Sequence, residues 1–128
     1  MTSTDAGPTT NSSTGAAISN VVVRVMSEYT GRGPTKARTH LSADLVTVVL
    51  EDVMTKGERS LVNDGKGDLV ISTRLAFQQT MSRDLIAAVQ DITGREVAAF
   101  LSANHLEPDM AVESFVLVPQ RATSDTRA

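Results

Sequence analysis

The spacing of apolar residues changes its period around Gly31–Pro34, and this change limits the folds open to the chain. From Ala16 to Tyr29 the apolar residues recur at steps of three and four, which places them on one face of a helix. Gly31 can end that helix, and Pro34 cannot continue it. After Pro34 the period changes to two, as along a half-buried β-strand. The chain is therefore predicted to begin with a helix that is followed by a strand.

The alternating segments predict two β-hairpins. Residues 36–41 and 45–50 flank Ser42–Asp44, which offers a turn. The second of these segments is apolar on both faces, so we expect it in the centre of a sheet. The first is half cationic and is expected nearer an edge. A second hairpin is predicted at residues 97–103 and 110–118.

Two helices are predicted between the hairpins. Thr55 and Glu58 have the spacing of a capping box, so a short helix should run from there to about Asn63. A long helix is expected between Asp68, as its N-cap, and Gly94, just past its C-terminus. Its apolar stripe would comprise Leu69, Val70, Phe77, Met81, Leu85, Ala88, Val89 and Ile92. The order is α-β-β-α-α-β-β, and the predicted fold class is α+β: a mainly antiparallel four-stranded sheet with helices packed on one face.

The composition indicates one small domain. The chain has 128 residues, of which 41% are hydrophobic, so it can bury one modest core. Residues 1–14 and 119–128 are polar, and we expect them to be disordered tails around a domain at residues 15–118. Cysteine is absent, which excludes disulfides and Cys-bound metals and fits the cytoplasm. No apolar run is long enough to span a membrane.

The segment from Gly31 to His40 concentrates cationic residues in a chain of net charge −3. One interpretation makes it a site for a carboxylate, bicarbonate or phosphate, because the glycines allow a close backbone approach and alternate strand residues point to one side. The candidate ligand-binding residues are Gly31, Arg32, Gly33, Lys36, Arg38 and His40. The alternative interpretation needs only turn chemistry: a helix end followed by a solvated strand edge.

A second glycine loop, Gly65-Lys66-Gly67, lies between the two predicted helices. KH domains of similar element order hold nucleic acid on a Gly-x-x-Gly loop at this junction. The loop is one residue shorter here, acidic residues flank it, and only 3% of the chain is aromatic. We therefore expect a plain helix–helix turn and no nucleic-acid partner, and keep a KH-like RNA-binding module as an alternative function.

No motif fixes a reaction. His40 and His105 are the only histidines and lack a metal-ligand spacing, so we expect no catalytic residue, no metal and no cofactor. An unrecognised small-molecule enzyme stays open as a further alternative. Arg74 falls beside the apolar stripe of the long helix, so we expect it to be partly buried and paired, with Glu58 or Glu113.

The order of several short motifs resembles the small MpsC-like domain. The residues that carry the resemblance are Gly31–Pro34, Thr55-x-x-Glu58, Arg74, Ile92–Gly94 and Phe115–Leu117. Met54 departs from the leucine expected before the threonine. The family is named for a sodium-translocating, membrane-potential-generating system of bacteria that is linked to the uptake of inorganic carbon.

The resemblance implies membrane transport proteins as partners and assigns no catalytic residues. We therefore expect a non-catalytic accessory or regulatory protein of such a system, in the cytoplasm and peripheral to the inner face of the membrane. The apolar residues on both faces of the strand at 45–50 would leave a surface that three helices do not cover. For this reason we also expect a homodimer.

Overall fold

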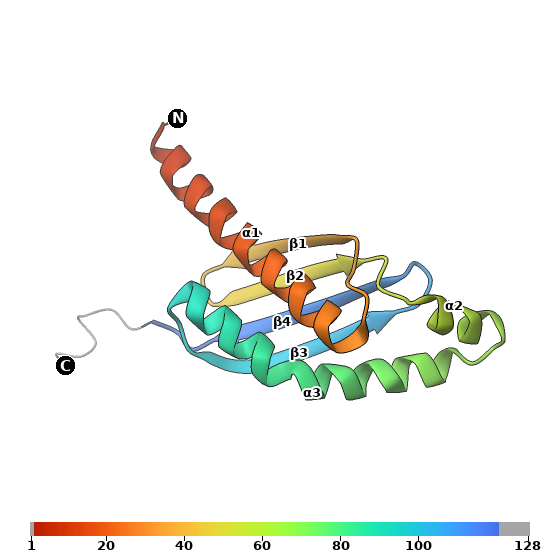
Figure 1. Cartoon of the computed structure of the whole chain (residues 1–128). Coiled ribbons are helices and arrows are strands. Elements are labelled where there is room, and N and C mark those ends of the chain that lie inside the picture. Colours follow the sequence, from red (N-terminus) through yellow and green to blue (C-terminus); the bar gives the residue numbers. More distant parts are fainter. Residues whose placement is uncertain (1, 121–128) are drawn as a thin grey trace.

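The computed structural model describes the backbone of residues 2–120 and the side chains of residues 13–120. Helices and strands follow in the predicted order, which confirms the α+β class (Figure 1). Their bounds are α1 Thr2–Thr30, β1 Lys36–Ser42, β2 Leu45–Glu51, α2 Lys56–Asn63, α3 Gly67–Thr93, β3 Val97–His105 and β4 Met110–Leu117. The strands form one antiparallel sheet in the order β1-β2-β4-β3. Strand β2 is therefore central and β1 lies at an edge, as the sequence predicts.

The two ends of the chain are only partly described. The sequence predicts a disordered tail over residues 1–14, whereas the helical backbone of α1 begins at Thr2. Gly15 of this helix lies beside Thr39 of β1. The side chains of residues 1–12 and all of residues 121–128 lie outside the described residues. The domain boundary expected at residue 15 and the C-terminal tail from residue 119 stay predictions.

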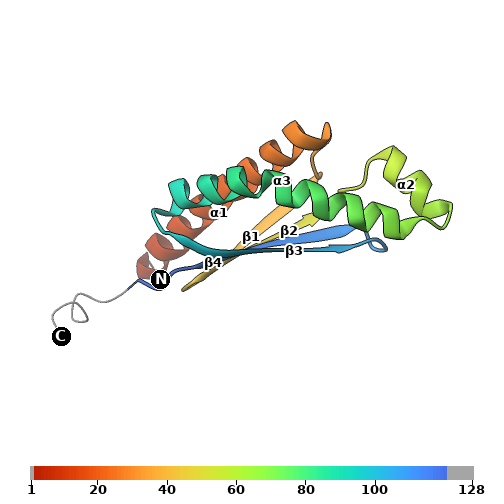
Figure 2. The ribbon, with the colours of Figure 1, turned by 90° about the horizontal axis from the view of Figure 1, so that it is seen from below.

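The helices cover one face of the sheet. Helix α1 packs on β1 and on α3, α3 packs on β3, and α2 packs against α3. Figure 2 shows all three helices on the same side of the strands. Buried apolar side chains from α1, α3 and the inward positions of β2 and β4 form the core, for example Val22, Leu85, Leu50 and Phe115. The ring of Phe115 lies 5.0 Å from that of Phe100, between ring centroids.

The inner face of α3 differs from the predicted stripe. Leu69 and Phe77 are 52% and 37% exposed, and the buried positions are Val70, Arg74, Gln78, Met81, Leu85 and Val89. Val70, Met81, Leu85 and Val89 are buried as predicted, and Ala88 and Ile92 are partly buried against the core. The prediction fails at Leu69 and Phe77, and it leaves out Arg74 and Gln78, because an apolar pattern does not select polar residues. Two polar residues take inward positions because polar groups of α2, β3 and β4 meet them there. The N-terminal half of α3 therefore packs through polar contacts and the C-terminal half through apolar ones.

The second face of the sheet carries no covering element in the described part of the chain. We call it the open face. It consists of the alternate positions Lys36, Arg38, His40 and Ser42 of β1, Leu45, Thr47, Val49 and Glu51 of β2, Met110, Val112, Ser114 and Val116 of β4, and Ala99, Leu101, Ala103 and His105 of β3. Its centre is mainly apolar, and its β1 edge carries the cationic side chains.

The alternation of faces along β4 gives a direct stability test. Phe115→Ala should lower the free energy of unfolding by about 3–5 kcal/mol, because Phe115 is buried in the core. Val116→Ala, one residue on and on the open face, should cost about 1 kcal/mol or less. Urea unfolding of both variants measures the difference. Equal losses would contradict the assignment of the two faces.

Candidate functional site

Arg74 of α3 lies at the centre of a buried polar cluster. The residue is only 5% exposed. Its Nε donates to Oε2 of Glu58 over 3.4 Å, and its Nη2 donates to Oε1 of Glu58 over 3.3 Å. The same Nη2 lies 3.9 Å from Oδ1 of Asp109, in the turn between β3 and β4. One guanidinium therefore joins α3 to α2 and to this turn.

Glu58 is held in place by the cap of its own helix. Oγ1 of Thr55 accepts a hydrogen bond from the Glu58 backbone N–H over 3.1 Å, and Oε1 of Glu58 accepts one from the Thr55 N–H over 2.9 Å. This is the capping box that the sequence predicts. The cap fixes the rotamer of Glu58, so its carboxylate meets Arg74 without further ordering.

Asp109 anchors the β3–β4 turn to the start of α2. Its Oδ2 accepts hydrogen bonds from the Met54 backbone N–H over 2.9 Å and from Nη2 of Arg59 over 3.3 Å. Its Oδ1 is buried and has no hydrogen-bond partner among the described residues. The Asp109 carboxylate is largely removed from water, whereas the side chain of Arg59 is about half exposed.

A second, less charged network lies one turn further along α3. Nε2 of Gln78 donates to Oε2 of Glu113 and to Oδ1 of Asn104, each over 3.0 Å. Nδ2 of Asn104 donates back to Oε1 of Gln78 over 3.0 Å. The hydroxyl of Ser102 donates to Oε1 of Glu113. Helix α3 therefore contacts the inner faces of β3 and β4 through an amide pair and a carboxyl group.

Burial raises the pKa of Glu113 from 4.5 to about 7, because the charged carboxylate loses its water. The hydrogen bonds from Ser102 and Gln78 and the charge of Arg74 oppose this rise. Glu113 is therefore a carboxyl group that exchanges its proton near neutral pH, inside a network of hydrogen bonds.

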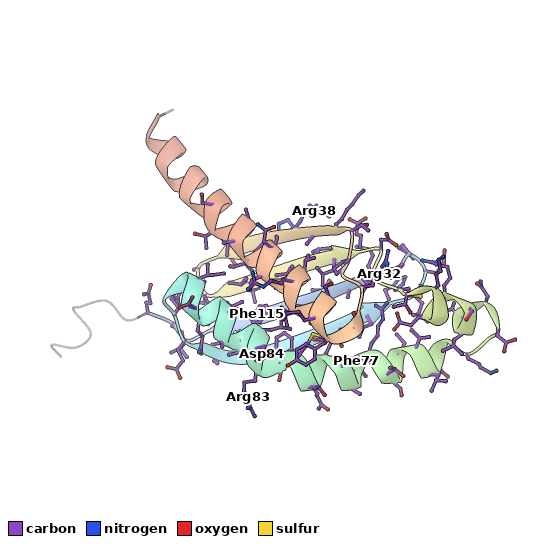
Figure 3. The ribbon with its side chains drawn as sticks, in the orientation of Figure 1. Arg32, Arg38, Phe77, Arg83, Asp84 and Phe115 are labelled. Carbon is purple, nitrogen blue, oxygen red and sulfur yellow. The ribbon has the colours of Figure 1, made fainter. Side chains whose placement is uncertain are left out.

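A small cavity of about 30 Å³ lies beside Arg74. The C-terminal part of α1 with the residues just after it, the segment before α2, the first turn of α2, and α3 border it. Its lining residues are Met26, Thr30, Arg32, Val53, Thr55, Glu58, Arg74, Phe77, Gln78 and Met81. Figure 3 shows Arg32 just past the end of α1 and Phe77 on the neighbouring part of α3. Three of the motifs that carry the family resemblance, at Arg32, Thr55–Glu58 and Arg74, converge on this cavity.

The two arginines of the predicted anion site have acidic partners. Nη2 of Arg32 lies 2.9 Å from Oδ2 of Asp52, and its Nη1 donates to the Asp52 carbonyl over 2.7 Å. Hydrogen bonds from Thr35 and Arg32 lower the pKa of Asp52. Nη2 of Arg38 lies 3.6 Å from Oε2 of Glu51 on the open face.

The six predicted residues are not brought together. Lys36, Arg38 and His40 lie on the open face, whereas Arg32 lines the cavity on the helix side. Gly31 has φ +82°, and its N–H donates to the Ser27 carbonyl, as at a helix end. A Cβ on Gly33 would lie 3.1 Å from Val23, so this glycine allows close packing on α1. Anion binding at this segment stays a prediction.

The Gly65-Lys66-Gly67 loop joins α2 to α3. Gly65 has φ +78°, which favours glycine. Nζ of Lys66 lies 2.8 Å from Oδ2 of Asp64, and a Cβ on Gly67 would lie 2.7 Å from a methyl group of Leu106. Turn geometry and packing thus account for both glycines, and RNA binding stays an untested alternative.

The network around Glu113 was not predicted from the sequence. Gln78, Ser102, Asn104 and Asp109 were not singled out, and Glu113 was named only as a partner for Arg74. One signal was present: in β4 the inward positions alternate as Ala111, Glu113, Phe115 and Leu117. A carboxylate in such a row needs a partner or a raised pKa. Among the described residues, no group of three or more His, Cys, Asp or Glu side chains is arranged to hold a metal ion.

Glu113 should make the stability of the protein depend on pH. Between about pH 4.5 and 7 the folded protein keeps a proton that the unfolded chain releases, so the free energy of unfolding should fall as the pH rises, by roughly 3 kcal/mol. Glu113→Gln should remove this slope and keep the contacts with Gln78 and Ser102. Urea unfolding across this pH range measures it, with Ser114→Ala on the open face as the control. A slope that survives in Glu113→Gln would show that another group causes it.

Comparison with known protein families identifies the chain. A family model described as MpsC, Na+-translocating membrane potential-generating system, matches residues 10–118. Comparisons with curated proteins and with solved structures gave no match. None of the described helices is long and apolar enough to cross a membrane. The matched range includes the open face and every residue that lines the cavity, and it confirms the resemblance seen in the sequence. The chain belongs to the MpsC family.

Proposed function

We propose that this protein is a non-catalytic accessory or regulatory subunit of a bacterial membrane system that transports ions or inorganic carbon. Membership of a family described as a Na+-translocating membrane potential-generating system is the observation that carries the proposal. The open face supports it, because an apolar sheet surface of this kind is suited to a partner protein. We place the protein in the cytoplasm, at the inner face of the membrane.

The open face favours a partner with an apolar surface and an acidic rim. Leu45, at the start of β2, and Leu101, on the edge strand β3, are 39% and 56% exposed, and the β1 edge presents Lys36, Arg38 and His40. Glu51 is the one carboxylate of this face, and Arg38 pairs with it. A partner that supplies carboxylates opposite β1 would pair the remaining cationic groups while it covers the leucines.

A second copy of the chain fits this face less well. Face-to-face packing would set the cationic row of β1 against itself or against β3, whose open positions are Ala99, Leu101, Ala103 and His105. These positions offer no carboxylate. The homodimer expected from the sequence therefore stays a prediction, and the subunit partner is the occupant that we propose.

Deletion and rescue in the native host test the proposal. Loss of the gene should lower the Na+-dependent membrane potential, read with a voltage-sensitive dye, and the wild-type gene should restore it. Leu101→Glu should fail to restore it, because a carboxylate in place of an exposed leucine of the open face opposes docking. Leu69→Glu is the matched control, since Leu69 is 52% exposed on α3, away from the open face. Circular dichroism of the two purified variants checks that both are folded.

Two outcomes would contradict the proposal in different ways. An unchanged membrane potential after deletion would exclude the role in this system. Full rescue by Leu101→Glu would exclude the open face as the docking surface. Light scattering at micromolar concentration adds the test of self-association: a dimer that Leu101→Glu dissociates and Leu69→Glu does not would assign the face to a second copy instead.

A further inference from the structure

Arg74 carries a hydrogen-bond donor that no group in the described chain satisfies. Its Nε and Nη2 are used by Glu58, but its Nη1 is buried and has no partner. Leaving a charged donor buried without a partner is costly. Arg74 also lines the cavity of about 30 Å³, so an occupant there would lie beside its guanidinium group.

The unused hydrogen-bonding capacity of the lining consists mainly of donors. The Thr55 hydroxyl accepts from the Glu58 N–H and keeps its own hydrogen free. Both groups of the Gln78 amide are used by Asn104 and Glu113, and Glu58 already accepts three hydrogen bonds. An occupant must therefore accept hydrogen bonds from Arg74 and Thr55.

The size and walls of the cavity limit the occupant further. A volume of about 30 Å³ exceeds the roughly 10–15 Å³ needed by one water molecule, so it suits two waters or an ion of three to four heavy atoms. Arg74 offers only Nη1 to the occupant, and the Thr55 hydroxyl offers a second donor, so two oxygens of one small oxyanion can be bound. The remaining wall is apolar, from Met26, Val53, Phe77 and Met81, and can pack against the faces of such an ion.

The paired charges around the cavity cancel. Arg32 pairs with Asp52, Arg59 with Asp109, and Arg74 with Glu58, so three arginines balance three carboxylates. Glu113 lies on the far side of Gln78, which bonds its Oε2. At a pH below its pKa, Glu113 is protonated and adds no negative charge.

We propose that this cavity is a binding site for a small planar oxyanion, held by Nη1 of Arg74 and the hydroxyl of Thr55. The site is distinct from the strand edge considered in the sequence analysis, with which it shares Arg32. It goes beyond the proposed function and does not depend on it, because the binding experiment uses the purified chain alone.

Formate and nitrate are suitable probes, with chloride at equal ionic strength as the control. The guanidinium NMR signals of Arg74 in the full chain should shift and saturate with either oxyanion at millimolar concentration and should not shift with chloride. The titration is done at about pH 6, where Glu113 is protonated. Arg74→Lys should weaken binding at least about tenfold, read by calorimetry. The single ammonium group of lysine cannot bond Glu58 and the oxyanion with separate nitrogens, as the guanidinium group of arginine can. Arg83→Lys, at an exposed arginine of the same helix, should bind as the unaltered protein does.

A second variant tests the cavity without touching a charge. Val53→Ile adds a methyl group to the lining and should also weaken binding at least about tenfold. Val49→Ile on the open face is its matched control and should have no effect. If Arg74→Lys fails to fold, the affinity of Val53→Ile for formate and nitrate decides whether the cavity is the binding site. The proposal would be overturned if the NMR signals of Arg74 showed no saturable shift with either oxyanion, or if Val53→Ile bound the oxyanions with unchanged affinity. The cavity would then be a site for water only.

Discussion

The buried ion pair between Arg74 and Glu58 positions one end of this domain. Helix α2 has no fully buried side chain, and its apolar residues Leu61 and Val62 are only half-buried, so apolar packing alone holds it weakly on the rest of the protein. Its position depends on Glu58 bonded to Arg74, on Arg59 bonded to Asp109, and on its backbone connection to α3. Removing two charges from water costs free energy, and the attraction between the charges offsets this cost only when their geometry is good. The capping box supplies this geometry by fixing the carboxylate of Glu58 in advance. A local helix cap thus becomes part of the tertiary structure.

The cavity follows from the same arrangement. Under the C-terminal half of α3, residues such as Leu85 and Val89 pack at the density of an apolar core. Under the N-terminal half, Arg74 and Gln78 meet carboxylates and amides, whose directions are set by hydrogen bonds rather than by the best filling of space. The space left over lies where the two kinds of packing meet, between Met81 and Arg74. It is therefore lined by apolar walls on one side and by unsatisfied donors on the other.

Local patterns were enough to predict most of the fold, but not the site. The order of elements, the capping box at Thr55 and the place of β1 at an edge all follow from spacing between near neighbours in the sequence. The bond from Gln78 to Glu113 depends on the polar residues that α3 turns inward, and an apolar pattern does not select Arg74 or Gln78. The pairing of Ser102 with Glu113 depends on the register of β3 against β4, which no local pattern determines.

The alternation of side chains along the strands separates the two surfaces to which we assign roles. In β3, Leu101 points to the open face, and Ser102 points inward to Glu113. In β4, Val112 and Ser114 flank Glu113 and point the other way. A substitution on the open face therefore removes no contact of the cluster around Arg74, and a substitution in the cavity removes none from the open face. Effects of distant, independent changes add. A departure from additivity between Leu101→Glu and Val53→Ile would consequently mean that the sheet itself shifts when one surface is changed, and would make β4 the element that connects them.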